Sequence, residues 1–329
     1  MKAFEYAGPS TVEEAIKSLA GAKSAVGLSG GTDLLSRMKD YVVSPDRVVY
    51  LKGIKPLSGI SEEKGGLVVG AGTRLADLVA NKTVTKEFPA LMQAALEVGT
   101  PQIRNMATVG GNLLQRPRCW YYRSGFGLLG KQDGKSLVRA GDNRYHSIFM
   151  TDGDALFTNP SSLAVPLIAL GAMATIAGEK GERTVPVESL FQVPKGDEDR
   201  ELTVGPNEVL TRVTIPEPKG KNASYEARQK RAHDWPLVLC SVVLEMDSNQ
   251  VMKARIVLGG VAPIPWRSKA AEEAIQGKAI SPETASAAAI AAVEAAKPLS
   301  MNAYKVTLAR TVVKRALLTA VGNRTWEEV

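Results

Sequence analysis

Cysteine and histidine are scarce in this chain. Its 329 residues include two cysteines, Cys119 and Cys240, and two histidines, His146 and His233. Two thiols form at most one bridge, so the sequence is not that of a disulfide-rich secreted scaffold. Neither a HExxH nor a CxxC motif occurs, and so few thiols and imidazoles argue against a metal site held by this chain.

Long apolar runs and clusters of one charge are also missing. No segment approaches the roughly 20 apolar residues of a membrane helix, and the opening residues MKAFEYA lack the apolar core of a signal peptide. The 41 Lys and Arg residues outnumber the 34 Asp and Glu residues, but the excess is scattered. A membrane span and a nucleic-acid partner are therefore not expected, whereas the net charge of +7 suits an anionic ligand or an acidic partner.

The remaining composition is that of an ordinary globular protein, with 44% apolar, 23% charged and 5% aromatic residues. A chain of this length divides into two or three domains. The order of expected strands and helices predicts an α+β fold in three parts, residues 1–55, 56–222 and 223–329. Residues 114–156 form a loop that is too long to be a simple connection.

Two glycine pairs, Gly30-Gly31 and Gly110-Gly111, follow segments that the pattern predicts to be strands. Glycine pairs at such positions indicate a positive φ or a close neighbour, and backbone amides beside a helix start bind phosphate. We expect Thr32-Asp33 to cap a helix after the first pair. Two such turns are able to hold the two phosphates of one dinucleotide, although each is also consistent with an ordinary tight turn. Neither is a GxGxxG motif or a P-loop.

Five motifs resemble a known family in the same order along the chain. They are GLSGGTDLLSRMK (27–39), GAGTRLADL (70–78), PQIRNMATVGGNLLQ (101–115), PSSLAVPLIALGA (160–172) and ARIVLGGVAPIPWRSKAAEEAIQGK (254–278). The chain resembles the FAD-binding medium subunit of the molybdenum hydroxylases, such as the flavin subunits of xanthine dehydrogenase, carbon monoxide dehydrogenase and bacterial aldehyde oxidoreductase. This resemblance implies a PCMH-type two-part FAD-binding domain followed by a C-terminal three-stranded sheet with helices.

The same resemblance implies FAD as the cofactor and a set of contacting residues. The set comprises Val26, Gly27, Leu28, Ser29, Gly30, Gly31, Thr32, Asp33, Leu34, Thr108, Gly110, Gly111, Asn112, Ser162, Leu210 and Lys230. Leu210 is expected near the flavin ring. Ser162 replaces the aspartate that is usual in the family, so a hydroxyl stands in for a carboxylate near the ribose.

A second departure from the family pattern lies in the basic stretch 225–231. Ala227 occupies the place where the family often has a lysine. Arg228, Lys230 or Arg231 would then supply a cation near the flavin, which would stabilise its reduced anionic form. The alternative is that this stretch is only a solvated basic segment.

The string RCWYYR (118–123) resembles the aldehyde oxidoreductase branch, whose flavin subunit carries an additional four-iron cluster in an inserted loop. Such a cluster needs about four thiolates, and Cys119 is the only cysteine between residues 114 and 156. We therefore predict no iron–sulfur cluster in this chain. The carboxylate pair Asp152 and Asp154 is expected to belong to a turn, with an acid–base dyad as the alternative.

The resemblance implies an oxidoreductase subunit that transfers electrons and has no catalytic acid or base of its own. Its partners would be an iron–sulfur subunit with two [2Fe–2S] clusters and a large molybdopterin subunit, which would oxidise the substrate. A free-standing flavin oxidase and a scaffold subunit that has lost FAD are the alternatives. The expected location is the cytoplasm, or the periplasm if the protein is exported as a folded complex with a partner.

Overall fold

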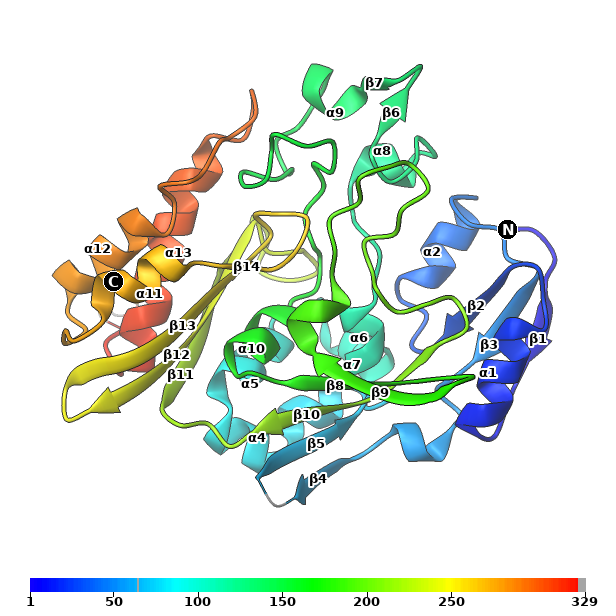
Figure 1. Cartoon of the computed structure of the whole chain (residues 1–329), viewed down its shortest axis with the longest axis horizontal. Coiled ribbons are helices and arrows are strands. Elements are labelled where there is room, and N and C mark those ends of the chain that lie inside the picture. Colours follow the sequence, from blue (N-terminus) through cyan, green and yellow to red (C-terminus); the bar gives the residue numbers. More distant parts are fainter. Residues whose placement is uncertain (64, 325–329) are drawn as a thin grey trace.

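The computed structural model describes residues 1–63 and 65–324, whose strands form three larger sheets and one two-stranded hairpin (Figure 1). In the view of Figure 1 the N-terminal sheet lies at the right, a five-stranded sheet in the centre and the C-terminal sheet at the left. Within the described residues, no helix combines the length and the apolar character needed to cross a membrane.

The N-terminal sheet is parallel, with the strand order β1-β3-β2. Its strands are β1 (Glu5–Ala7), β2 (Ala25–Leu28) and β3 (Arg47–Tyr50), connected by α1 (Val12–Ala20) and α2 (Leu34–Lys39). Thr11 caps α1, because its side chain accepts a hydrogen bond from the Glu14 amide. The buried face of α1 packs against both this sheet and the central one, with Leu19 between Val49 and Val209 in a shared apolar cluster.

The central sheet has the strand order β4-β5-β10-β8-β9 and contributes the largest apolar core. Its strands are β4 (Ile60–Glu63), β5 (Gly66–Gly70), β8 (Met173–Gly178), β9 (Gly181–Pro186) and β10 (Val209–Pro216). The elements around it are η1 (Lys55–Leu57), α3 (Leu75–Ala80), α4 (Lys82–Glu87), α5 (Pro89–Leu96), α6 (Pro101–Met106), α7 (Val109–Leu113), α10 (Ala164–Ala169) and η2 (Val187–Leu190). Neighbouring strands are antiparallel, and short connections join the pairs β4-β5 and β8-β9.

The C-terminal sheet has three long strands, as expected, and a short fourth strand extends it. The strands are β11 (Lys221–Ala227), β12 (Val238–Asp247), β13 (Gln250–Gly259) and β14 (Trp266–Arg267), and the helices are α11 (Lys269–Ile275), α12 (Pro282–Ala291) and α13 (Tyr304–Ala320). The helices cover the outer face of this sheet in Figure 1 and share one apolar core with it. α10 packs on β12 and β13 and thereby joins this part to the central sheet.

Residues 114–156 contain short helices and strands. The buried Lys305 hydrogen-bonds the backbone near residue 145. The elements are α8 (Trp120–Arg123), β6 (Lys131–Gln132), β7 (Lys135–Ser136) and α9 (Leu137–Ala140). Lys305 on α13 donates hydrogen bonds from Nζ to the carbonyl oxygens of Tyr145, His146 and Gly260. Burial lowers the pKa of Lys305 to about 7.

The structure corrects the expected conformation of the second glycine pair. Gly110 and Gly111 do not follow a strand, because α6 precedes them and both lie within α7. Thr108 caps α7 by accepting a hydrogen bond from the Gly111 amide at 3.2 Å. The β-branched dipeptide Thr108-Val109 therefore begins a helix instead of ending a strand.

Candidate functional site

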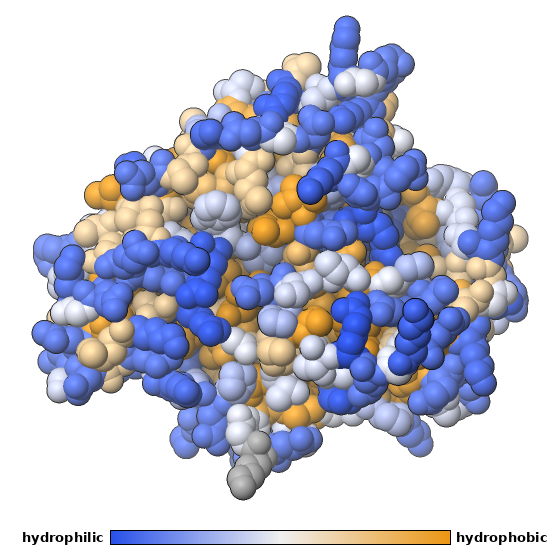
Figure 2. All heavy atoms as spheres, viewed as in Figure 1, coloured by the Kyte–Doolittle hydropathy of each residue, from blue (hydrophilic) through white to orange (hydrophobic). Residues whose placement is uncertain are grey.

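A cavity of about 690 Å³ lies where segments from several parts of the chain meet. Most of the lining residues lie in the ranges 25–37, 98–118, 160–162, 200–210 and 233–235, and others include Leu51, Leu57, Ala71 and Gly72. This volume lies within the range of sites that enclose a cofactor or a small molecule. On the face shown in Figure 2, hydrophilic side chains predominate, with apolar ones in groups between them.

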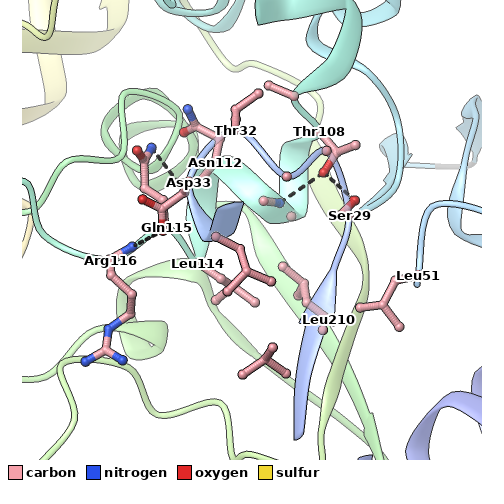
Figure 3. Close-up of a pocket in the computed structure, with 18 of the residues that line it drawn as sticks. Ser29, Thr32, Asp33, Leu51, Thr108, Asn112, Leu114, Gln115, Arg116 and Leu210 are labelled. Atoms are coloured by element: carbon pink, nitrogen blue, oxygen red, sulfur yellow. Dashed lines mark hydrogen bonds between the residues drawn. The ribbon is translucent and has the colours of Figure 1, made fainter. Parts of the chain in front are cut away.

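The first glycine loop, residues 29–33, and the second, residues 108–112, lie side by side in one wall of this cavity (Figure 3). The hydroxyl oxygens of Ser29 and Thr108 are 2.8 Å apart and hydrogen-bonded, although 79 residues separate them along the chain. The sequence interpretation of the two loops required this proximity. One ligand can therefore contact both loops.

Close packing explains why two of these positions carry glycine. A Cβ atom on Gly30 would lie 2.2 Å from the Met106 carbonyl oxygen, and one on Gly110 would lie 2.9 Å from the Ala71 Cβ. Gly31 has a φ of +75°, which favours glycine because L side chains seldom adopt it. Gly30 and Gly110 are thus required by contacts within the protein, and Gly31 by its backbone conformation.

The backbone amides of the two loops differ in their availability. Among the described residues, nothing accepts a hydrogen bond from the amides of Gly30, Gly31 or Thr32, and all three residues line the cavity. The amides of the second loop are already used: Gly110 donates to the Ala71 carbonyl, and Gly111 and Asn112 donate to Thr108. The expectation that both loops present free amides therefore holds only for the first loop.

Asn112 connects the second loop to the segment 160–163. Its Oδ1 accepts hydrogen bonds from the Ser161 hydroxyl at 2.9 Å and from the Leu163 amide at 3.1 Å. The neighbouring Ser162 is buried and lines the cavity, and no described residue bonds its hydroxyl. Ser162 therefore offers its hydroxyl to a ligand, whereas Ser161 is committed to the protein.

Apolar side chains line the cavity on either side of the loops. Leu51 and Leu57 belong to one apolar cluster, and Leu210 shares another with Val98 and Ile103. Such surfaces accept planar ring systems, while the amides between them suit the phosphates. The residues present thus fit a dinucleotide that carries a ring system at each end.

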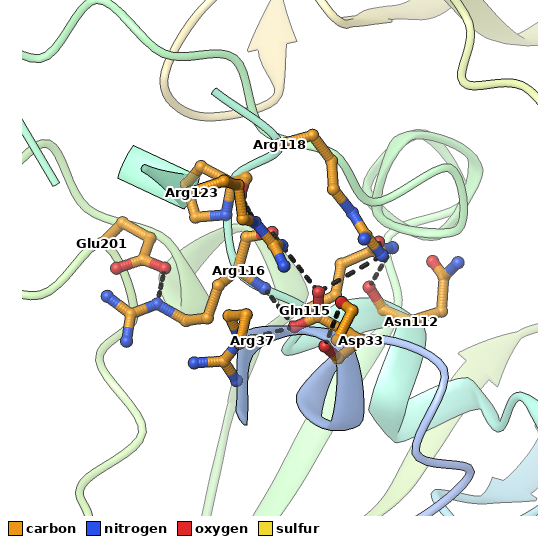
Figure 4. Close-up of polar contacts among 10 residues, drawn as sticks. Asp33, Arg37, Asn112, Gln115, Arg116, Arg118, Arg123 and Glu201 are labelled. Carbon is orange, nitrogen blue, oxygen red and sulfur yellow. Dashed lines mark hydrogen bonds and ion pairs between the residues drawn. The ribbon is translucent and has the colours of Figure 1, made fainter. Parts of the chain in front are cut away.

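Asp33 does not cap α2 as expected. Although it occupies the N-cap position, its side chain makes no capping bond, and its carboxylate accepts hydrogen bonds or forms ion pairs with arginines from two segments (Figure 4). The distances are 3.2 Å from Arg37 Nε, 3.3 Å from Arg118 Nη2 and 2.7 Å from Arg123 Nη2, and the Arg116 amide donates at 3.2 Å. Burial raises the pKa of this carboxyl, but the guanidinium groups outweigh burial and hold the pKa below its usual value.

The same arginines extend to the cavity rim. Arg116 pairs with the buried Glu201, and the guanidinium of Arg118 stacks on the Trp235 ring at 4.6 Å from its centroid. Burial lowers the pKa of Arg118 to about 10, with smaller contributions from the neighbouring Arg123 and Arg37. The sequence had given no role to this cluster, although Arg116, Arg118 and Arg123 stand close together in the string QRPRCWYYR.

Most of the predicted contact residues line the cavity. They are Val26, Gly27, Ser29, Gly30, Gly31, Thr32, Asp33, Leu34, Thr108, Gly110, Gly111, Asn112, Ser162 and Leu210. Leu28 and Lys230 do not line it: Leu28 is part of β2, and Lys230 is an exposed residue in the turn before β12. From that turn it is His233, Asp234 and Trp235 that reach the cavity.

The other titratable groups noted in the sequence do not form a site. Asp152 pairs with Lys297 and Asp154 with Lys131, each at 2.8 Å, which argues against an acid–base dyad. Cys119 Sγ lies 3.2 Å from His146 Nε2, and burial lowers the pKa of His146 to about 4. Within residues 1–63 and 65–324, no group of three or more potential metal ligands occurs. That this chain holds no iron–sulfur cluster stays a prediction.

Two family descriptions match consecutive parts of the chain. Residues 2–218 match the FAD binding domain in molybdopterin dehydrogenase, and residues 223–320 match the CO dehydrogenase flavoprotein C-terminal domain. The chain is 31% identical to the aldehyde oxidoreductase FAD-binding subunit PaoB of Escherichia coli over 97% of its length and 99% of that protein. It is likewise 31% identical to the carbon monoxide dehydrogenase medium chain of Hydrogenophaga pseudoflava, over 95% and 96% of the two chains.

Solved structures show the same similarity. A carbon monoxide dehydrogenase from H. pseudoflava superposes with a TM-score of 0.76 at 29% identity, covering 98% of both chains. Quinoline 2-oxidoreductase from Pseudomonas putida 86 gives a TM-score of 0.77 at 26% identity, covering 98% of this chain and 99% of the other.

Proposed function

Because the chain belongs to the FAD-binding medium subunits of the molybdenum hydroxylases, we propose that it passes electrons from a partner's iron–sulfur clusters to an external acceptor. FAD supplies the redox chemistry and exchanges one or two electrons at a time. The residues of this chain bind the cofactor, orient it and set its electrostatic surroundings. The substrate would be oxidised on a separate molybdopterin subunit, and this chain needs no catalytic acid or base.

The contact between Ser29 and Thr108 carries this proposal. It supports the proposal because it brings the free amides of the first loop next to the ordered backbone of the second loop, so that one ligand would contact both. We propose that the diphosphate lies on the amides of Gly30, Gly31 and Thr32, because amides that point at an anion stabilise its charge. Ser162 would bond the ribose through its hydroxyl, and the apolar walls would take the rings.

We also propose roles for the three parts of the chain, the partner subunits and a location. Residues 1–55 and 56–222 would act as the two halves of the cofactor site, and residues 223–329 would form the third domain. The partners would be a small subunit with two iron–sulfur clusters and a large molybdopterin subunit. The complex would be cytoplasmic, with export as a folded complex as the alternative.

Purification and flavin analysis of the full-length chain test the function. We expect one FAD per chain after reconstitution, an absorbance band near 450 nm and no substrate turnover by the chain alone. Reduced protein should be reoxidised by an added acceptor. Turnover of a small substrate by the isolated chain would support a flavin oxidase, and failure to bind FAD at all would support a scaffold subunit; either result refutes the proposal.

A further inference from the structure

An arginine cluster beside the first glycine loop carries more positive charge than the protein compensates. It contains five guanidinium groups and two carboxylates, namely Arg37, Arg116, Arg118, Arg123 and Arg200 against Asp33 and Glu201. All of these arginine side chains except Arg200 form an ion pair with one of the two carboxylates. A half-buried excess of like charge is unfavourable unless an anion joins it.

Arg200 is the member of the cluster with open donors. It lines the cavity, and no described residue forms a hydrogen bond or an ion pair with its guanidinium. The adjacent carboxylate of Glu201 is committed to Arg116. Burial lowers the pKa of Arg200, and the charges of Arg116 and Arg37 lower it further. The Nε atom of Arg118 is likewise buried without a hydrogen-bond partner.

The cluster adjoins the free amides of the first loop. Asp33 directly follows Thr32 in the sequence, and its carboxylate holds the guanidinium groups of Arg37 and Arg118. Arg37, Arg116 and Arg200 line the same cavity as Gly30 and Gly31. The cavity thus combines open guanidinium donors with open amides, and both kinds of donor match phosphoryl oxygens.

We infer that Arg200, together with Arg37 and Arg116, binds the diphosphate of the dinucleotide and adds guanidinium charge to the stabilisation that the amides of the first glycine loop provide. This inference rests on the proposed function, since it concerns the same ligand. The two negative charges of the diphosphate would then offset the excess positive charge of the cluster. Asp33 then acts as a positioning residue, because its carboxylate holds the side chain of Arg37 and the backbone amide of Arg116.

Titrations of the flavin-free, full-length protein with FAD and with riboflavin test the inference. Riboflavin shares the flavin ring but has no phosphate. Arg200→Gln should weaken FAD binding about tenfold, the loss of roughly one charge-assisted hydrogen bond, and leave riboflavin binding unchanged. Arg200→Lys keeps the charge and should lose no more than about threefold. Arg310→Gln, at an exposed position on α13, is the matched control and should bind FAD like the wild type.

Competition and salt give a second readout. Pyrophosphate should displace FAD from the wild type, and added salt should weaken FAD binding more in the wild type than in Arg200→Gln, because screening acts on the charge that the variant lacks. Equal FAD affinity of the variant and the wild type would overturn the inference, as would an equal loss of riboflavin affinity. Pyrophosphate that binds the FAD-loaded protein without displacing FAD would also overturn it. In each of these cases the wild type still binds FAD, so the proposed function stands.

Discussion

The two glycine loops have similar sequences but make different use of their backbones. The first loop leaves the amides of Gly30, Gly31 and Thr32 without acceptors and ends at Asp33, which is surrounded by arginines. The second loop is a short helix whose amides are all occupied by neighbouring backbone or by Thr108. A Gly-Gly pair therefore does not by itself define a phosphate site. The first loop presents free backbone amides to the cavity, and the second contacts the first through the hydrogen bond between Ser29 and Thr108.

The largest effect should come from filling the space between the loops. Gly30→Ala puts a methyl group against the backbone of Met106 and Ala107, which cannot rotate away. We expect a loss of about 3 kcal/mol in the free energy of unfolding and the loss of FAD binding, measured by urea denaturation and flavin absorbance. Gly153→Ala is the control, since nothing lies within 4 Å of the added carbon. An unchanged stability of Gly30→Ala would contradict the close packing of the loops.

The arginines around Asp33 distinguish the first loop from the second, and a substitution of Asp33 tests their effect on stability. Asp33→Asn leaves three guanidinium groups without their carboxylate and should cost about 3 kcal/mol of stability in the flavin-free protein at pH 7. Since the folded protein holds the pKa of Asp33 below its ordinary value of 3.8, the wild type has this stabilisation above pH 3.8 and loses it as the pH falls through the folded pKa.

The difference in unfolding free energy between wild type and Asp33→Asn should accordingly be constant from pH 7 to pH 5 and shrink below pH 3.8. Urea denaturation at several pH values measures it. Asp152→Asn serves as the control, because its ion pair with Lys297 is exposed and contributes little. A difference that does not change with pH would show that the arginines do not stabilise the Asp33 carboxylate.

A smaller effect is expected from the hydroxyl that links the loops. Thr108→Val removes both the cap on the Gly111 amide and the hydrogen bond to Ser29, and should cost about 1.5 kcal/mol. Ser29→Ala removes only the second bond and should cost about 0.5 to 1 kcal/mol. Thermal denaturation of the two variants and of the double variant separates the contributions. Additive losses would mean that the two hydroxyls do not interact.

The smallest effect on the protein itself should come from Ser162. Its hydroxyl bonds no described residue, so Ser162→Ala should change the unfolding free energy by less than about 0.5 kcal/mol. If the hydroxyl bonds the ribose, FAD affinity should fall about fivefold. Ser161→Ala, which breaks the bond to Asn112, should instead lower stability. A lower stability without a change in affinity for Ser162→Ala would remove this residue from the site.

The sequence predicted those features that depend on local pattern. The strand before the first glycine pair, which is Ala25–Leu28 in the structure, was predicted because strand signals act over a few residues. The family, the fold class and FAD as the cofactor followed from ordered motifs along the whole chain and are confirmed by the family matches and relatives.

The features that sequence reasoning missed depend on contacts between distant residues. Asp33 is a plausible cap when only its neighbours are considered, but Arg123 bonds it from 90 positions away. The predicted conformation of Gly110-Gly111 was wrong for a related reason. Thr108 is a residue type that favours strands, yet here it caps α7. The placement of Lys230 outside the cavity depends on the turn 228–235, whose His233 has a φ of +55° and bonds Gly99 through its amide.

A crystal structure of the chain with FAD bound would show directly which residues hold the diphosphate. We expect diphosphate oxygens within hydrogen-bond distance of the amides of Gly30, Gly31 and Thr32, with the second loop beside the first against the same ligand. A diphosphate held elsewhere, with these amides facing only water, would contradict it.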